Sequence, residues 1–209
     1  MSFGRSVARK ILGGLFGAVL LMSTMDSAGA ISLNPITAIK SAVEAAVEER
    51  SADDIGTDLK LKTKIVAEVF DKMIDDVISI GADVYEQDVM LTGVVEKASQ
   101  KAQAAKLTKA VEGVKKVYNE ILVIKAVDKK KGAVEGFVDD AVIESKVNAL
   151  LLDGQGVNVT NFRWRSVGGR VFLFGRALSN PELKKAIGIV KEIKGVTGIT
   201  SRVKVRAKN

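Results

Sequence analysis

Along this chain the spacing of hydrophobic residues alternates between that of a helix and that of a strand. The same succession of spacings occurs in two consecutive rounds. Each round opens with the spacing of an amphipathic helix, which in the second round places Ile143, Val147 and Leu151 on one face. An aspartate precedes each stripe, Asp58 in the first round and Asp140 in the second, and we expect it to be the N-cap of the helix. A strict alternation of apolar and polar residues follows, and a period of two predicts a strand.

The remaining parts of each round also correspond. A short polar turn predicts a hairpin that leads into a second strand, at 89–95 in the first round and 171–177 in the second. Helical spacing then returns over about 99–111 and 181–193, and a last strand closes the round. The predicted order is therefore helix, strand, strand, helix, strand in both halves.

An offset of 82 residues aligns the second round with the first without a gap. Identical residues run through every predicted element, so one short motif does not explain the match. They include the pairs Asp58 and Asp140, Lys64 and Lys146, Val89 and Val171, Leu91 and Leu173, Gly93 and Gly175, and Val123 and Val205. The chain is therefore predicted to carry two tandem copies of one domain.

This repeat divides the chain into five segments. The two domains are expected at 58–125 (copy one) and 138–206 (copy two). A stretch with three consecutive lysines, 126–137, is the predicted linker, and 31–57 adds an N-terminal helical segment. Residues 1–30 have the composition of a leader sequence.

The leader has the three parts of a secretory signal peptide. Basic residues precede an apolar run of twelve residues, Ile11–Met22, and Ala28 and Ala30 form the small-x-small pattern that signal peptidase cleaves. The alternative is a retained membrane anchor, for which twelve apolar residues are short against the ~20 that span a bilayer. We expect export to the periplasm, with cleavage after Ala30 and a soluble mature protein.

Composition excludes most catalytic and metal chemistry. The 209 residues include no Cys and no His, which removes disulfides, thiolate nucleophiles, zinc-finger spacings and His-based triads. We therefore predict no enzyme activity, no cofactor and no metal site. Charge also divides the chain, because 31–127 carries 13 basic and 16 acidic side chains whereas 128–209 carries 16 basic and 8 acidic ones. This asymmetry suggests an anionic partner for one half, or pairing of one half with the other.

Three motifs occur once in each copy, in the same order. They are Asp-x5-Lys-[Ile/Val] in the first helix, Val-x-Leu-x-Gly in the second strand and Gly-Val-x-x-[Val/Ile] before the last strand. With this order and spacing the chain resembles the BON family, an envelope module shared by osmotically induced and nodulation-type proteins. Together with the periodicity, the resemblance implies an α+β fold of two tandem α-β-β-α-β domains. Each domain would have a three-stranded mixed sheet with two helices on one face.

The resemblance also carries expectations about function. Two-copy members are periplasmic and non-enzymatic, are associated with outer-membrane integrity and osmotic stress, and some bind anionic phospholipid. In lipid-binding relatives the first helix of copy two makes the contact, often with an aromatic residue in its first turn, whereas this chain has Ala141-Val142-Ile143 there. The candidate lipid-binding residues are Phe137, Val142, Lys146, Leu152, Arg163 and Arg165.

Alternation along the strands predicts a second candidate surface. If Val171, Leu173 and Gly175 face the helices, Phe172 and Phe174 lie on the opposite face of the sheet. Copy two then presents an aromatic and cationic face, and copy one an acidic and aliphatic face. The candidate interdomain residues are Asp83, Met90, Glu120, Leu122, Ile124, Phe172, Phe174 and Arg202. Three alternatives stay open, in which these faces pack on each other, bind an external ligand or lipid, or contact solvent.

These observations favour a non-enzymatic exported envelope protein with peripheral membrane contact. It would bind anionic phospholipid or envelope surfaces and support outer-membrane integrity or osmotic stress tolerance. The alternative is a periplasmic structural adaptor that docks onto an envelope protein complex without lipid contact. Neither nucleic acid nor a small-molecule substrate is expected as a partner. Gly168-Gly169 resembles a phosphate-binding loop, but its place in the repeat favours a hairpin turn.

Overall fold

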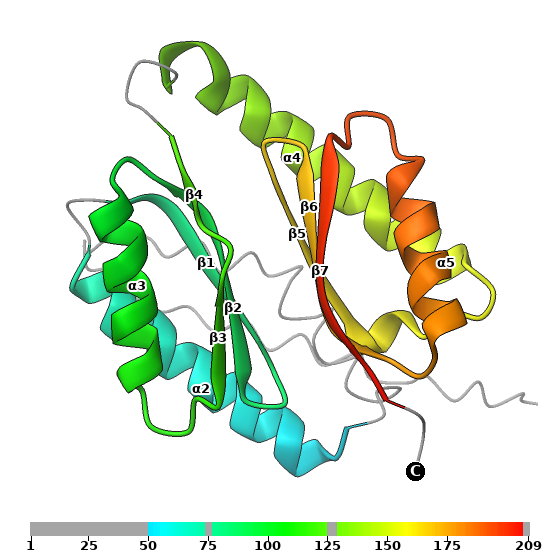
Figure 1. The fold of residues 1–209 in the computed structure, drawn as a ribbon, viewed down its shortest axis with the longest axis horizontal. Coiled ribbons are helices and arrows are strands. Elements are labelled where there is room, and N and C mark those ends of the chain that lie inside the picture. The colour runs from blue at the N-terminus through cyan, green and yellow to red at the C-terminus, as the bar shows by residue number, and fades with distance from the viewer. Residues whose placement is uncertain (1–49, 74–76, 125–128, 207–209) are drawn as a thin grey trace, which may run out of the picture.

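A computed structural model describes residues 50–73, 77–124 and 129–206. The predicted signal peptide and most of the segment 31–57 lie outside these residues. Within them, two domains stand with their sheets toward each other and their helices on the outer sides (Figure 1).

Copy one is a mixed sheet covered on one face by two helices. Its first two strands form an antiparallel hairpin, and the strand after the second helix pairs parallel with β2. That last strand is interrupted, so β3 and β4 follow each other along the same edge of β2. The elements are α2 (Ala52–Asp71), β1 (Val77–Tyr85), β2 (Asp88–Val95), α3 (Ala98–Ala110), β3 (Lys116–Asn119) and β4 (Leu122–Val123).

Copy two repeats this order around its own sheet. Strand β5 is antiparallel to β6, and β7 is parallel to it, so the strand order β5-β6-β7 matches that of copy one. The elements are α4 (Lys129–Asp153), the short 3₁₀ helix η3 (Val159–Asn161), β5 (Phe162–Val167), β6 (Arg170–Ala177), α5 (Asn180–Lys191) and β7 (Gly198–Val205). The predicted fold class of two tandem α-β-β-α-β domains is confirmed.

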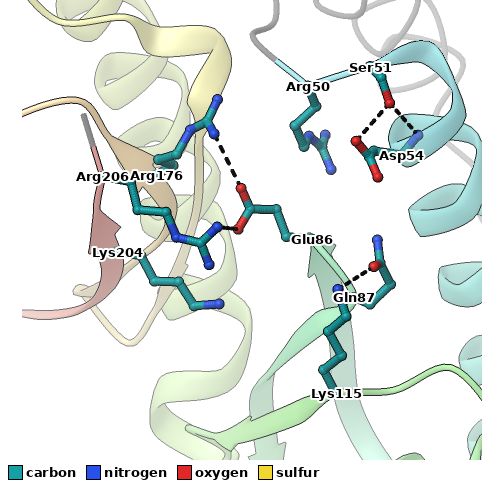
Figure 2. A pocket seen from close by; sticks show the side chains of 9 residues that line it. All are labelled: Arg50, Ser51, Asp54, Glu86, Gln87, Lys115, Arg176, Lys204 and Arg206. Atoms are coloured by element: carbon teal, nitrogen blue, oxygen red, sulfur yellow. Dashed lines mark hydrogen bonds and ion pairs between the residues drawn. The ribbon is translucent and has the colours of Figure 1, made fainter. Parts of the chain in front are cut away.

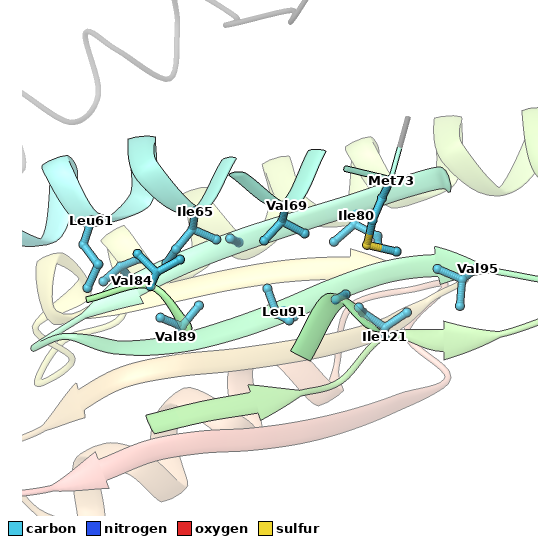
Figure 3. Close-up of a cluster of buried hydrophobic side chains, with 13 residues drawn as sticks. Leu61, Ile65, Val69, Met73, Ile80, Val84, Val89, Leu91, Val95 and Ile121 are labelled. Atoms are coloured by element: carbon cyan, nitrogen blue, oxygen red, sulfur yellow. The ribbon is translucent and has the colours of Figure 1, made fainter. Parts of the chain in front are cut away.

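Each domain has its own hydrophobic core between helices and sheet. In copy one Ile65 and Val69 of α2 meet Leu91 of β2, as Figure 3 shows. In copy two the equivalent Val147 and Leu151 of α4 meet Leu173 of β6. Because side chains alternate along a strand, these contacts direct every second residue of β2 and β6 to the other face of the sheet.

A glycine at the same point of β2 and β6 has a backbone conformation that side chains disfavour. Gly93 has φ 121° and Gly175 has φ 109°. A Cβ at Gly175 would lie 2.1 Å from the carbonyl oxygen of Asn161, so no larger residue fits there. In copy two the glycine of the strand motif is therefore explained by backbone packing against η3.

The predicted helix starts were wrong. Helix α2 begins at Ala52 and α4 at Lys129, so Asp58 and Asp140 lie inside their helices and are not N-caps. Much of the predicted linker 126–137 thus belongs to α4. Both carboxylates point instead toward the hairpin turn of their own domain, which contributes backbone N–H groups as donors.

Candidate functional site

The open faces of the two sheets meet in a third buried cluster. Tyr85 and Met90 of copy one pack with Phe172 and Phe174 of copy two, and all four side chains are at most 2% exposed. The ring of Phe174 lies edge-on to two tyrosines, with centroids 6.5 Å from Tyr85 and 5.9 Å from Tyr118. Leu122 and Val167 pack at the margin of this cluster.

Ion pairs between the domains surround the apolar cluster. In each ion pair between described residues of the two domains, copy one supplies the carboxylate and copy two the cation, as expected from the uneven charge of the halves. The nitrogen–oxygen distances are 3.3 Å for Arg165 and Asp83, 2.6 Å for Arg202 and Glu120, 2.6 Å for Lys204 and Asp88, and 3.4 and 3.1 Å from Glu86 to Arg176 and Arg206.

Asp83 is a buried carboxylate that faces copy two. Burial alone would raise its pKa, but the nearby charges of Arg165, Lys62 and Arg163 outweigh burial and lower the pKa from 3.8 to about 2. Lys62 of α2 donates to Oδ1 at 3.2 Å, while Arg165 donates to Oδ2 at 3.3 Å. One carboxylate thus joins the helix layer of copy one to the sheet of copy two.

Glu144 of α4 holds the other side of Arg165. Its Oε2 lies 3.6 Å from the Arg165 guanidinium, and its Oε1 accepts a hydrogen bond of 2.9 Å from the Ser166 N–H. Burial raises the pKa of Glu144, partly offset by that N–H group and by Arg165. Arg165 is therefore positioned from both domains.

The predicted interdomain residues do not all share one environment. Met90, Phe172 and Phe174 are in the buried cluster, Leu122 is at its margin, and Asp83, Glu120 and Arg202 are in the ion pairs. Ile124 is half-buried and its N–H donates to the Val95 carbonyl, but it is not part of the cluster.

Sequence reasoning missed the two tyrosines of the cluster. Tyr85 is two residues after Asp83 on β1, and Tyr118 is two residues before Glu120. A period of two places residues at this spacing on one face of a strand. The same alternation that selected Asp83 and Glu120 could therefore have found both rings.

A polar cavity of about 290 Å³ lies where the domains meet beside the first hairpin turn. Figure 2 shows Glu86 at its centre, facing Arg176 and Arg206, while the Nζ of Lys115 donates to the Gln87 side chain at 2.7 Å. Both domains contribute to the lining, which consists of Arg50, Ser51, Asp54, Glu86, Gln87, Lys115, Arg176, Lys204 and Arg206. In the described part of the chain, no group of three or more acidic residues is arranged to hold a metal ion.

The predicted lipid-binding residues separate into two groups. Val142 and Leu152 of α4 are 47% and 62% exposed, and Lys146 is exposed near them. Arg163 and Arg165 instead point between the domains, where Arg163 lies 5.6 Å from the ring of Tyr85. The backbone of Phe137 is part of α4, but its side chain lies outside the described residues.

Among the side chains that the structure describes, helix α4 exposes three large apolar residues, whereas the equivalent helix α2 exposes one, Leu59. Val142, Lys146 and Leu150 are spaced by four residues and form one stripe, in which Leu150 is 44% exposed. The equivalent residues of α2 are Lys60, Lys64 and Glu68, all charged and exposed. Within the described ranges no helix is long and apolar enough to span a bilayer. The apolar stripe is therefore a surface feature of copy two.

Comparison with known proteins assigns a family to both halves. The BON domain model matches residues 57–125 and 139–207. Osmotically-inducible protein Y of Escherichia coli (strain K12) is 30% identical over 154 residues, which is 74% of this chain and 73% of that protein. A protein from Anaplasma centrale named for the gshII 5'region is 34% identical over 128 residues, 61% of this chain and 82% of its own length.

One solved structure aligns over much of the chain, but only loosely. It is the type III secretion structural protein CdsD of Chlamydia trachomatis, 8% identical, and the alignment covers 70% of this chain and 94% of that one. The TM-score of 0.30 is too low to indicate a shared overall arrangement.

Proposed function

This chain belongs to the BON domain family, and from that premise we propose that it is an exported envelope protein whose second BON domain binds anionic phospholipid surfaces through helix α4. The leader sequence supports export, with a mature N-terminus at Ile31. The similarity to an osmotically inducible protein supports a role in osmotic stress tolerance.

The exposed stripe of α4 is the observation that carries the lipid proposal. Val142 and Leu150 are about half exposed on one face of the helix, and Lys146 lies between them. Leu152, the most exposed large apolar residue among those described, adds a further exposed apolar side chain near the end of the helix, outside this stripe. Burial of such residues at the boundary between headgroups and acyl chains lowers the free energy of the system and so favours binding.

Charge favours an anionic membrane over a neutral one. The second half of the chain has twice as many basic as acidic side chains, and Lys146 belongs to the stripe itself. A basic residue near an anionic surface contributes about 1 kcal/mol, and salt weakens this attraction. With three partly exposed apolar side chains, binding is expected to be peripheral, reversible and sensitive to salt.

Vesicle flotation of the protein isolated from the periplasm tests this proposal. Vesicles with phosphatidylglycerol are expected to float the protein at low salt, and pure phosphatidylcholine vesicles are not. The triple variant Val142→Ser, Lys146→Gln, Leu152→Ser should lose at least tenfold in vesicle affinity. Since Lys64 is the equivalent of Lys146 in copy one, Lys64→Gln is the matched control and should float as the parent does.

Two results would contradict the proposal. Equal flotation of the parent and the triple variant would exclude α4 as the contact. Equal binding to neutral and anionic vesicles would exclude the role of charge. N-terminal sequencing of the same preparation is expected to start at Ile31, and a retained leader would refute the proposed cleavage after Ala30.

A further inference from the structure

Two of the five ion pairs described between the domains join positions that are equivalent in the repeat. Asp83 pairs with Arg165, and Glu120 pairs with Arg202, each at a separation of 82 residues. The buried cluster between the sheets contains Met90 together with its equivalent Phe172. A separation of 82 is the offset of the repeat, so each of these residues faces its own counterpart.

Strand register places positions 83 and 90 side by side in one sheet and positions 165 and 172 side by side in the other, while Glu120 and Arg202 lie two residues beyond the same row. In copy one Met90 of β2 lies between Asp83 of β1 and Tyr118 of β3. In copy two the equivalent row is Arg165, Phe172 and Thr200 across β5, β6 and β7. Residues face their own counterparts only beside a twofold axis. A pseudo-twofold axis therefore runs between the two sheets, across the strands.

A twofold interface between two identical domains would place like charges together. Pairing copy one with another copy one would bring Asp83 against Asp83 and Glu120 against Glu120. Pairing copy two with itself would bring Arg165 against Arg165 and Arg202 against Arg202. Like charges in a partly buried interface are strongly unfavourable, whereas the pairing of unlike copies replaces both repulsions by ion pairs.

We propose that the two sheet faces form a charge-coded recognition surface on which copy one binds only copy two, either of its own chain or of a second chain. The apolar cluster supplies the attraction, and the two self-facing pairs, 83 with 165 and 120 with 202, decide which copies pair. This surface is separate from the α4 stripe, because the helices lie on the outer sides of the sheets (Figure 1). Its test is therefore independent of lipid binding.

Two full-length variants test directly whether these two charge pairs decide which copies bind each other. In the first, Asp83→Arg and Glu120→Arg place two cations at each self-facing pair. In the second, Arg165→Asp and Arg202→Glu place two carboxylates at each self-facing pair. Closure of either chain on itself brings like charges together at both pairs, so each alone is expected to be a monomer with a larger radius of gyration than the parent. Mixed at low salt, they should form a 1:1 complex in light scattering, because each face then meets one of opposite charge.

A second set of variants, with changes at less buried positions, keeps the proposal testable if the first two variants do not fold. Asp83 is buried, whereas the Glu120 and Arg202 side chains are 16% and 44% exposed and belong to neither domain core. Glu120→Arg and Arg202→Glu can therefore be tested as single variants. The double variant carrying both changes should recover the compaction of the parent. Lys184→Glu, an exposed change on α5, is the control and should alter neither compaction nor association.

Three outcomes would overturn the proposal. They are a mixture of the two inverted chains that stays monomeric, an inverted chain that associates with itself, and single charge inversions that leave the chain as compact as the parent. Circular dichroism of each variant verifies that the domains are folded. If the first pair of variants fails this criterion, the pair Glu120→Arg and Arg202→Glu alone decides the question.

Discussion

At the scale of single residues, Asp83 shows how charges from two domains stabilise one buried carboxylate. It is 5% exposed, and burial without compensation would favour its neutral form. Lys62 from its own domain and Arg165 from the other reverse this preference, and the pKa falls to about 2. Because an unfolded aspartate has a pKa near 3.9, the ionised form stabilises the folded protein above about pH 4.

This pKa predicts a loss of stability in acid. As the pH falls from about 4 to 2, the contribution of Asp83, about 2 kcal/mol, should disappear. Comparing denaturant unfolding of the parent and Asp83→Asn isolates the effect, because the variant lacks the titrating group. The difference in unfolding free energy between them should shrink over this window. The exposed Asp53→Asn should not change it, and an unaltered difference down to pH 2 would contradict the assignment.

At the scale of elements, one aspartate joins the first helix of each domain to the hairpin turn. The Asp140 carboxylate accepts hydrogen bonds from the Gly168 and Gly169 N–H groups at 2.7 and 2.9 Å, and from the Ser166 hydroxyl at 2.6 Å. Asp58 does the same for Glu86 and Gln87 at 2.7 and 2.8 Å. The motif aspartate therefore fixes the position of the helix along the hairpin.

Removing this connection should destabilise copy two. Asp140→Ala leaves three donors without their acceptor, which is expected to cost about 1–3 kcal/mol. Trp164 is the only tryptophan of the chain and packs in the core of copy two, so its fluorescence reports thermal unfolding of that domain. The midpoint of this transition should fall for Asp140→Ala. It should stay unchanged for the neighbouring exposed Asp139→Ala, and equal midpoints for both variants would show that the carboxylate bonds are dispensable.

At the scale of the whole molecule, three apolar clusters have separate roles. Two lie inside the domains, and the third, with Met90, Phe172 and Phe174, lies between them. Burying one such side chain contributes about 1.5–3 kcal/mol, whereas an exposed ion pair contributes only about 0–1 kcal/mol. The aromatic cluster should therefore supply most of the docking free energy, and the ion pairs should set the orientation.

Truncating the aromatic pair should separate the domains without unfolding them. Phe172→Ala with Phe174→Ala is expected to increase the radius of gyration in small-angle scattering and to preserve the Trp164 unfolding transition. Leu173 lies between them in sequence but belongs to the core of copy two. Leu173→Ala should instead lower the unfolding free energy of copy two by ~2–5 kcal/mol, as large-to-small core changes do. An unchanged radius of gyration in the double variant would argue against docking through these rings.

Local patterns in the sequence determined the architecture of each domain. The offset of 82 residues, the change of period from 3.6 to 2 and the turn positions gave the order of elements in both copies, because each reflects contacts between near neighbours in the chain. Alternation also placed Phe172 and Leu173 on opposite faces of β6, as the structure shows. The sequence also showed that the Val-x-Leu-x-Gly motif ends in a glycine, but not why. The fold gives the reason in copy two, where the backbone of Asn161 lies too close to Gly175 for a side chain.

Long-range geometry decided what the motif residues do. Asp140 resembles an N-cap in sequence, but its hydrogen-bond partners lie 28 and 29 residues away, at a turn that only the packing of α4 on the hairpin brings close. The exposure of Val142 and Leu150 beside the buried Ile143 likewise follows from the angle at which α4 lies on its sheet. The pairing of each charge with its counterpart in the other copy depends on how two sheets face each other. Periodicity describes one element at a time, so it specifies which face of a strand is free but not what that face meets.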